Sequence, residues 1–146
     1  MDFTAPVSRI MTRKLFTVVP GDPLTEVKKI FDEHRIHHIP VVKYTTLVGI
    51  ISEVDFIHVT KGHGTKAHDE STENEFLEKY TAEDIMTTGI ATIESKERIN
   101  VALQIFAENL FHALPIVDDG QLVGMVTTFD IIKSLVEEDN ARITAV

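Results

Sequence analysis

The stretch GMVTTFD, Gly124–Asp130, has an earlier counterpart in GIISEVD, Gly49–Asp55. Both read glycine, two apolar residues, a hydroxyl residue, two variable positions and aspartate. A shift of 75 positions aligns residues 10–58 with residues 85–133 without a gap. Of these 49 pairs 15 are identical, where unrelated sequences would share roughly three. The chain is therefore predicted to contain two copies of one supersecondary unit.

Each copy is expected to contain a strand, a helix, a two-stranded hairpin and a second helix, after a short helical lead such as VSRIM or AEDIM. In the first copy, the apolar residues of DPLTEVKKIFDEH recur at helical spacing, with Asp22 as the expected N-cap and Pro23 at the first helical position. Residues 43–45 are short enough to form the hairpin turn, and the second helix is expected to open at Ser52. The expected elements before that helix are a strand at 15–20, a helix at 22–34 and strands at 38–42 and 46–52.

One such unit buries too little apolar surface to be stable alone. We therefore predict a mixed α/β (α+β) fold in which two β-α-β-β-α repeats, related by a pseudo-two-fold axis, pack sheet to sheet. The acidic linker is expected to be partly flexible, with a short helix at ENEFLEKY that docks through Phe76, Leu77 and Tyr80. The expected boundaries are repeat 1 at 6–60, the linker at 61–80, repeat 2 at 81–135 and a tail at 136–146 that is frayed or extends the last helix.

The composition limits the classes of function. The 146 residues include no cysteine, which excludes disulfides, thiolate catalysis and thiolate-bound zinc. The formal net charge of −9 opposes binding to a nucleic-acid backbone. No apolar run approaches the roughly 20 residues of a membrane helix, and the first residues lack the pattern of a signal peptide. We therefore expect a cytoplasmic protein that binds neither nucleic acid nor membrane.

The repeated hydroxyl and aspartate have two compatible explanations. A Ser or Thr followed three residues later by an acidic residue resembles a capping box at the start of a helix. The preceding glycine also allows another group to approach the strand closely, and a helix N-terminus presents free N–H groups to anions. An aspartate can accept from two neighbouring hydroxyls, as on ribose. The residues concerned are Gly49, Ser52 and Asp55 in the first copy, and Gly124, Thr127 and Asp130 in the second.

The chain resembles a tandem pair of cystathionine-β-synthase (CBS) domains, also called a Bateman module. The resemblance covers about residues 6–135 and rests on IMT, FTV, LTEVKKIFDEHRIHHIPVV and LVGIISEVDFI, with their second-copy counterparts IMT, ATI, INVALQIFAENLFHALPIV and LVGMVTTFDII. It implies a stand-alone regulatory module, not an enzyme, that binds AMP, ADP, ATP, S-adenosylmethionine or a related metabolite in clefts between the repeats. It also implies a homodimer with an unknown downstream protein partner and no required cofactor.

The resemblance implies a role for particular residues. The aspartate of each motif would hold ribose, the first strand would enclose adenine, and residues before the buried strand would face phosphates. Each cleft is expected to combine the aspartate of one repeat with the first strand of the other. The first cleft would comprise Asp130, Thr127, Thr12, Leu15, Phe16, Thr17, His37, His38 and Pro40. The second would comprise Asp55, Ser52, Thr87, Ile90, Ala91, His112 and Pro115. Arg13 and Lys14 make the first cleft the better phosphate site.

Other interpretations remain open at this stage. The run HRIHH could hold a metal, but its helix should end near Arg35 and its strand begin near His38, so the histidines need not converge. Phosphate contact by His37 or His38 and ordinary surface or core histidines are the alternatives, and His63 and His68 are expected to be solvent exposed. No nucleophile–base pair or phosphate loop indicates an enzyme, and no metal is expected. Because no phosphate-binding arginine precedes either proline, the alternative function is a constitutive dimerisation or protein-interaction module with empty clefts.

Overall fold

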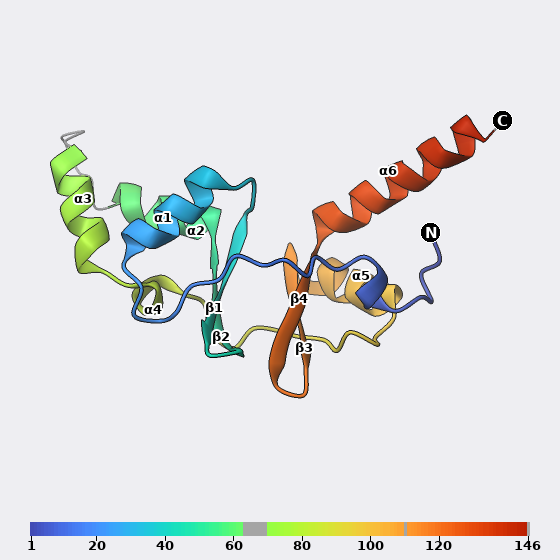
Figure 1. Cartoon of the computed structure of the whole chain (residues 1–146), viewed down its shortest axis with the longest axis horizontal. Coiled ribbons are helices and arrows are strands. Elements are labelled where there is room, and N and C mark those ends of the chain that lie inside the picture. Colours follow the sequence, from blue (N-terminus) through green and yellow to red (C-terminus); the bar gives the residue numbers. More distant parts are fainter. Residues whose placement is uncertain (63–69, 110, 146) are drawn as a thin grey trace. The chain divides into compact units, whose positions relative to one another are not determined.

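The computed structural model describes residues 1–62, 70–109 and 111–145, and the chain divides into two compact units (Figure 1). The terminal unit combines Met1–Leu15 with Ala91–Val146, and the central unit is Phe16–Ile90. The elements of the central unit are α1 (Leu24–Glu33), β1 (His38–Lys43), β2 (Thr46–Ser52), α2 (Glu53–Gly62), α3 (Glu70–Lys79) and α4 (Ala82–Ile85). Those of the terminal unit are η1 (Val7–Arg9), α5 (Ile99–Asn109), β3 (Ala113–Asp118), β4 (Gln121–Thr127) and α6 (Thr128–Thr144).

An antiparallel hairpin forms the sheet of each unit, as the sequence predicts. In the central unit β1 pairs with β2, and in the terminal unit β3 pairs with β4. Each residue pair of the first hairpin recurs 75 residues later in the second, as His38–Ser52 does at Ala113–Thr127. Both hairpins also carry an irregularity in register at the equivalent place. The repeat in the sequence is therefore a repeat of strand register as well as of composition.

The predicted first strand of each repeat is reduced to a single bridge. The Val18 N–H donates to the Pro40 carbonyl at 3.1 Å, and the Val18 carbonyl accepts from the Val42 N–H at 2.9 Å. Ile93 forms the equivalent parallel bridge with Ile116 in the terminal unit. Neither run is long enough to count as a strand, so the prediction of a full strand at 15–20 is wrong.

The predicted cap of α1 is also wrong. The Asp22 carboxylate accepts from the Val19 N–H at 2.9 Å and not from the first turn of the helix. The bond does not compete with the pairing to β1, because Val18 makes that pairing and the Val19 N–H faces the other side of the chain. The pairing ends because Pro20 has no N–H for the next bond. The helix itself begins at Leu24, with Pro23 as its N-cap in extended conformation. Proline lacks a side-chain acceptor, so α1 starts without a side-chain cap.

The lead of each repeat is hydrogen-bonded to the hairpin of the other repeat. In the terminal unit, the Thr12 N–H donates to the Met125 carbonyl at 2.8 Å and the Met125 N–H donates to the Thr12 carbonyl at 3.0 Å. In the central unit, Thr87 and Ile50 exchange the equivalent bonds at 2.9 and 3.0 Å. The leads are thus exchanged between the repeats. The folded units do not coincide with the repeats, because the lead of one repeat belongs to the unit of the other.

Helix α3 docks on the core of the central unit, which confirms the prediction for ENEFLEKY. Leu77 is fully buried among the core residues, and Phe76 and Tyr80 pack against the same cluster. The Phe76 and Tyr80 rings lie 4.6 Å apart, centroid to centroid. Residues 63–69 of the expected linker, which include His63, Gly64 and His68, lie outside the described residues. At the other end of the sequence, the expected tail extends the last helix, because α6 continues to Thr144.

Candidate functional site

The start of α6 is a complete capping box. The Thr127 N–H and the Thr127 Oγ1 hydroxyl donate to Asp130 Oδ2, at 2.8 and 2.9 Å. In return, Thr127 Oγ1 accepts from the Asp130 N–H at 3.1 Å. The capping explanation of this motif is therefore confirmed. One Asp130 oxygen is occupied by the cap, while Oδ1 accepts no hydrogen bond from the described residues.

The start of α2 is capped more weakly. Ser52 Oγ accepts from the Asp55 N–H at 3.0 Å. No described residue donates to the Asp55 carboxylate, which is exposed, whereas Asp130 is half-buried. The two copies of the motif therefore share one cap bond and differ in how their aspartates are held.

In both α2 and α6, the N–H of the first helical residue donates to a backbone carbonyl. The Glu53 N–H donates to the His37 carbonyl at 2.8 Å, and the Thr128 N–H donates to the His112 carbonyl at 3.1 Å. With the third N–H taken by the hydroxyl cap, only the second N–H of each helix lacks a partner among the described residues. These are the N–H groups of Val54 and Phe129. Each helix start therefore offers an anion one backbone donor and not three.

The motif glycines are explained by contact with methionine. A Cβ on Gly49 would lie 2.5 Å from Met86 Sδ, and a Cβ on Gly124 would lie 2.8 Å from Met11 Sδ and 3.0 Å from the Thr12 carbonyl oxygen. Each methionine belongs to the IMT lead of the other repeat. The close approach expected at these glycines is therefore made by the exchanged lead. Sequence analysis missed this role, although the repeated IMT was its visible signal.

The exchange assigns the predicted ligand residues to units. Thr12 lies in the same unit as Asp130, and Thr87 lies in the same unit as Asp55. Of the residues predicted for the first cleft, the terminal unit contains Thr12, Leu15, Thr127 and Asp130, and the central unit contains Phe16, Thr17, His37, His38 and Pro40. Of those predicted for the second cleft, the central unit contains Ser52, Asp55, Thr87 and Ile90, and the terminal unit contains Ala91, His112 and Pro115. Convergence of these groups into two clefts stays a prediction.

Several predicted ligand residues already have contacts inside the central unit. The Phe16 ring stacks on the His34 ring, with centroids 3.6 Å apart and planes inclined by 19°. His37 is exposed, with Nδ1 3.8 Å from Glu53 Oε1. Pro40 is fully buried. Of these three, His37 has the side chain most accessible to an anionic ligand, and the Phe16–His34 stack presents an aromatic surface that sequence analysis did not predict.

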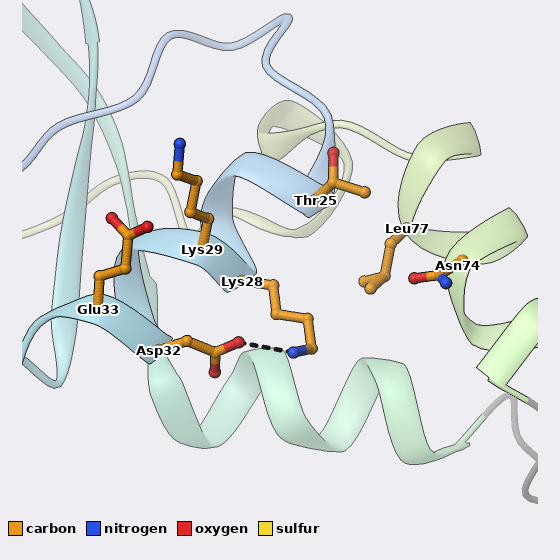
Figure 2. Close-up of a pocket in the computed structure, with 7 residues that line it drawn as sticks. All are labelled: Thr25, Lys28, Lys29, Asp32, Glu33, Asn74 and Leu77. Atoms are coloured by element: carbon orange, nitrogen blue, oxygen red, sulfur yellow. Dashed lines mark hydrogen bonds and ion pairs between the residues drawn. The ribbon is translucent and has the colours of Figure 1, made fainter.

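A separate depression of about 300 Å³ lies between α1 and α3 (Figure 2). Lys28 Nζ donates to Asp32 Oδ2, one turn along α1, at 2.6 Å, and this bond raises the pKa of Lys28. None of the predicted ligand residues lines it. The lining residues are Thr25, Lys28, Lys29, Asp32, Glu33, Asn74 and Leu77. With its cations and anions mixed and one pair already bonded, this depression offers no single charge to a ligand.

The described ranges contain neither a metal-binding cluster nor a membrane-spanning helix. Among these residues, no three His, Asp or Glu side chains lie close enough together to hold a metal ion. No helix in the described part of the chain is long and apolar enough to cross a membrane.

Comparison with known proteins gives a consistent result. The family model of the CBS domain matches residues 7–62 and 82–137. An inosine-5′-monophosphate dehydrogenase of Thermoplasma acidophilum is 30% identical over 124 residues, which are 84% of this chain and 22% of that protein. The chain spans less than half the length of the first curated relatives that it matches.

Solved structures are similar over nearly the whole chain. The CBS domain of a CBS-domain-containing membrane protein from Sphaerobacter thermophilus is 29% identical, with a TM-score of 0.76 over 90% of this chain and 88% of that one. The CBS domain pair of protein MJ0100, in complex with 5′-methylthioadenosine and S-adenosyl-L-methionine, is 25% identical. Its TM-score is 0.74, over 92% of this chain and 98% of that one.

Proposed function

We propose, from the premise that this chain belongs to the CBS-domain family as a pair of repeats, that it is a regulatory module which binds an adenosine nucleotide or a related adenosyl metabolite. The observation that carries the proposal is the doubled motif at the starts of α2 and α6, each with an aspartate beside a hydroxyl. The similar CBS pair of protein MJ0100 was solved with two adenosyl compounds. A non-enzymatic sensor in the cytoplasm fits this combination.

The aspartates are the proposed ribose ligands. Asp130 can serve as both cap and ligand, because Oδ2 takes both cap bonds and Oδ1 has no partner among the described residues. Neither oxygen of Asp55 accepts a hydrogen bond from the described residues, so both are available to a ribose. A ribose with two adjacent hydroxyls is the chemical group that matches a fixed carboxylate with a free oxygen. The remaining residues predicted for each cleft would surround the adenine and the phosphate or its substitute.

The clefts are proposed to be unequal. Arg13 and Lys14 supply positive charge to the first, whereas Thr88 and Gly89 stand at the equivalent positions in the second. A phosphate-bearing nucleotide is therefore expected to prefer the first cleft. A ligand without phosphate, such as 5′-methylthioadenosine, has no such preference.

Isothermal titration calorimetry with AMP, ADP, ATP, S-adenosylmethionine and 5′-methylthioadenosine tests the proposal. We expect binding of at least one of them, and its loss in Asp130→Ala or in Asp55→Ala, according to the cleft used. Asp84→Ala is the matched control, because Asp84 closes a similar capping box with Thr81, at 2.8 Å, and is not a predicted ligand residue. Binding that survives both cleft variants, or no binding of any ligand in the series, contradicts the proposal.

A constitutive dimerisation module is the second candidate. Equivalent positions of α2 and α6 expose apolar side chains, Val54 with Ile57 and Phe129 with Ile132. The single free N–H at each helix start also limits binding of anions. This candidate predicts a homodimer whose melting temperature and mass do not respond to any adenosyl compound. A homodimer is proposed under both candidates, so the ligand titration decides between them.

A further inference from the structure

An aromatic pair joins the residues before the Val18 bridge to the end of α1. The Phe16 and His34 rings stack with centroids 3.6 Å apart and planes inclined by 19°. At this separation two nearly parallel rings are in van der Waals contact and overlap over most of their area. One face of each ring is therefore covered by the other ring, and only the second face of each remains for a further flat group.

Packing in the core does not account for the Phe16 ring. Phe16 is half-buried, and within the described ranges it belongs to neither core cluster and is not among the partly buried apolar side chains that pack against them. The equivalent residue of the second repeat, Ala91, does pack against the core of the terminal unit. Asn109 stands at the position equivalent to His34, and its amide donates to the Ile105 carbonyl of its own helix at 3.0 Å. The stack is thus a feature of the first repeat alone.

The stack lies at the end of the hairpin at which α2 begins. Val18 forms a parallel bridge with Val41, so Phe16, two residues earlier, lies toward the start of β1. The first residue of β1, His38, pairs with Ser52, whose hydroxyl caps α2. The aromatic pair and one of the two capped helix starts therefore share the same end of the central unit.

We propose that His34 is a positioning residue of the ligand site, which holds the Phe16 ring so that its second face stacks on the base of the ligand. The inference rests on the function proposed above, in which Phe16 lines the first cleft. Purine bases stack on flat aromatic side chains. His34 suits the holding role because its backbone is fixed at the end of α1, where its N–H donates to the Ile30 carbonyl at 3.1 Å. A ring that is held before binding loses less conformational entropy when the ligand arrives.

The stack gives the first cleft a preference that does not depend on charge. A ligand without phosphate, such as 5′-methylthioadenosine, gains nothing from Arg13 and Lys14, but its base can stack on Phe16. The same base would find no ring at the equivalent position of the second repeat, which is Ala91. We therefore expect 5′-methylthioadenosine to prefer the first cleft, as a phosphate-bearing nucleotide does.

Isothermal titration calorimetry of the full chain with AMP, ADP, ATP, S-adenosylmethionine and 5′-methylthioadenosine tests the proposal. Phe16→Leu keeps an apolar side chain without a ring face, and it should weaken each compound that the parent binds by at least about fivefold. His34→Ala should weaken them by about three- to tenfold, since it frees the Phe16 ring, and it leaves the backbone bond to Ile30 in place. His34→Phe should restore most of this loss, because a second ring can again stack on Phe16. Asn109→Ala, the same truncation at the equivalent position, is the matched control and should leave binding unchanged.

A double variant shows whether His34 acts through Phe16. When Phe16→Leu is already present, His34→Ala should weaken binding no further, because no ring is left to hold. Unchanged binding in His34→Ala, equal losses in His34→Ala and His34→Phe, or fully additive losses in the double variant overturn this proposal and leave the proposed function intact. A parent chain that binds none of the adenosyl compounds overturns both. Melting temperatures of all variants, recorded in parallel, separate a loss of binding from a loss of folding.

Discussion

Substitution of Gly49 by alanine tests the exchanged lead most directly. The added Cβ would lie 2.5 Å from Met86 Sδ, 2.8 Å from Met86 Cγ and 3.0 Å from Met86 Cβ. The sulfur can rotate away, but the last contact lies close to the backbone and can be relieved only by moving the lead. Overpacking of this kind costs about 1–3 kcal/mol of unfolding free energy. For a chain of this length, that corresponds to a fall in melting temperature of roughly 3–10 °C.

A double-mutant cycle with Met86→Ala isolates the contact. Met86→Ala alone is expected to destabilise the protein by about 1–2 kcal/mol, at the lower end for methionine because its side chain is only partly buried. In the double variant the contacts with Sδ and Cγ are absent and only the 3.0 Å contact with Cβ remains. The loss of stability in the double variant should therefore be smaller than the sum of the two single losses by at least about 0.5 kcal/mol. Urea denaturation gives the free energies. Gly21→Ala is the control and should be neutral, because a Cβ there meets nothing within 4 Å.

Two results would contradict the contact between Gly49 and Met86. If Gly49→Ala is as stable as the parent, the lead does not lie against β2 as described. If the two losses in the cycle add fully, Gly49 and Met86 do not touch, and the glycine of the motif requires another explanation, such as the approach of a ligand.

Three further predictions concern the turns and caps. Tyr44→Gly should raise the unfolding free energy by about 1 kcal/mol in urea denaturation, because Tyr44 is an exposed residue with φ 58° and glycine adopts this conformation without strain. Thr127→Ala should lower it by about 0.5–2 kcal/mol through loss of the cap, measured by urea denaturation. Hydrogen bonds from the Ser95 side chain and from the Ser95 N–H lower the pKa of Asp118 below its ordinary value of 3.8. The stabilisation from Asp118 is therefore full above that value and is lost as the pH falls through the lowered pKa. The difference in stability between the parent and Asp118→Asn should therefore be larger at pH 7 than in acid.

Much of the fold could be predicted because the sequence contains two copies of the same unit. The resemblance to a CBS pair is confirmed by the family match, and the hairpins, the cap at Thr127 and the docked α3 follow from local patterns. The failures are also local. A β-rich run such as LFTVVP satisfies the composition of a strand, but the bond to β1 that would follow Val18 needs an N–H at residue 20, and Pro20 has none, so the pairing ends after one bridge.

The exchange of leads could not be predicted from the residues alone. Periodicity shows that residue 11 is equivalent to residue 86, but it does not tell which hairpin each one contacts. Only the three-dimensional arrangement shows Met11 against Gly124 and Met86 against Gly49. Likewise, the sequence gives the ligand residues as a set, and it does not show that Asp130 is held by its cap while Asp55 is not.

The difference between the two aspartates allows effects on stability and effects on ligand binding to be measured separately. Any change that removes the Asp130 carboxylate also removes two cap bonds, so a loss of ligand binding in Asp130→Ala could arise from a loosened helix start. Asp55 has no such bonds from the described residues, and Asp55→Ala should leave stability nearly unchanged. If a ligand uses the second cleft, Asp55→Ala therefore removes binding without lowering the melting temperature. If it uses the first, Asp130→Asn provides the comparison, because the amide oxygen can still accept the two cap bonds while the oxygen that would accept from ribose is replaced by an NH₂ donor.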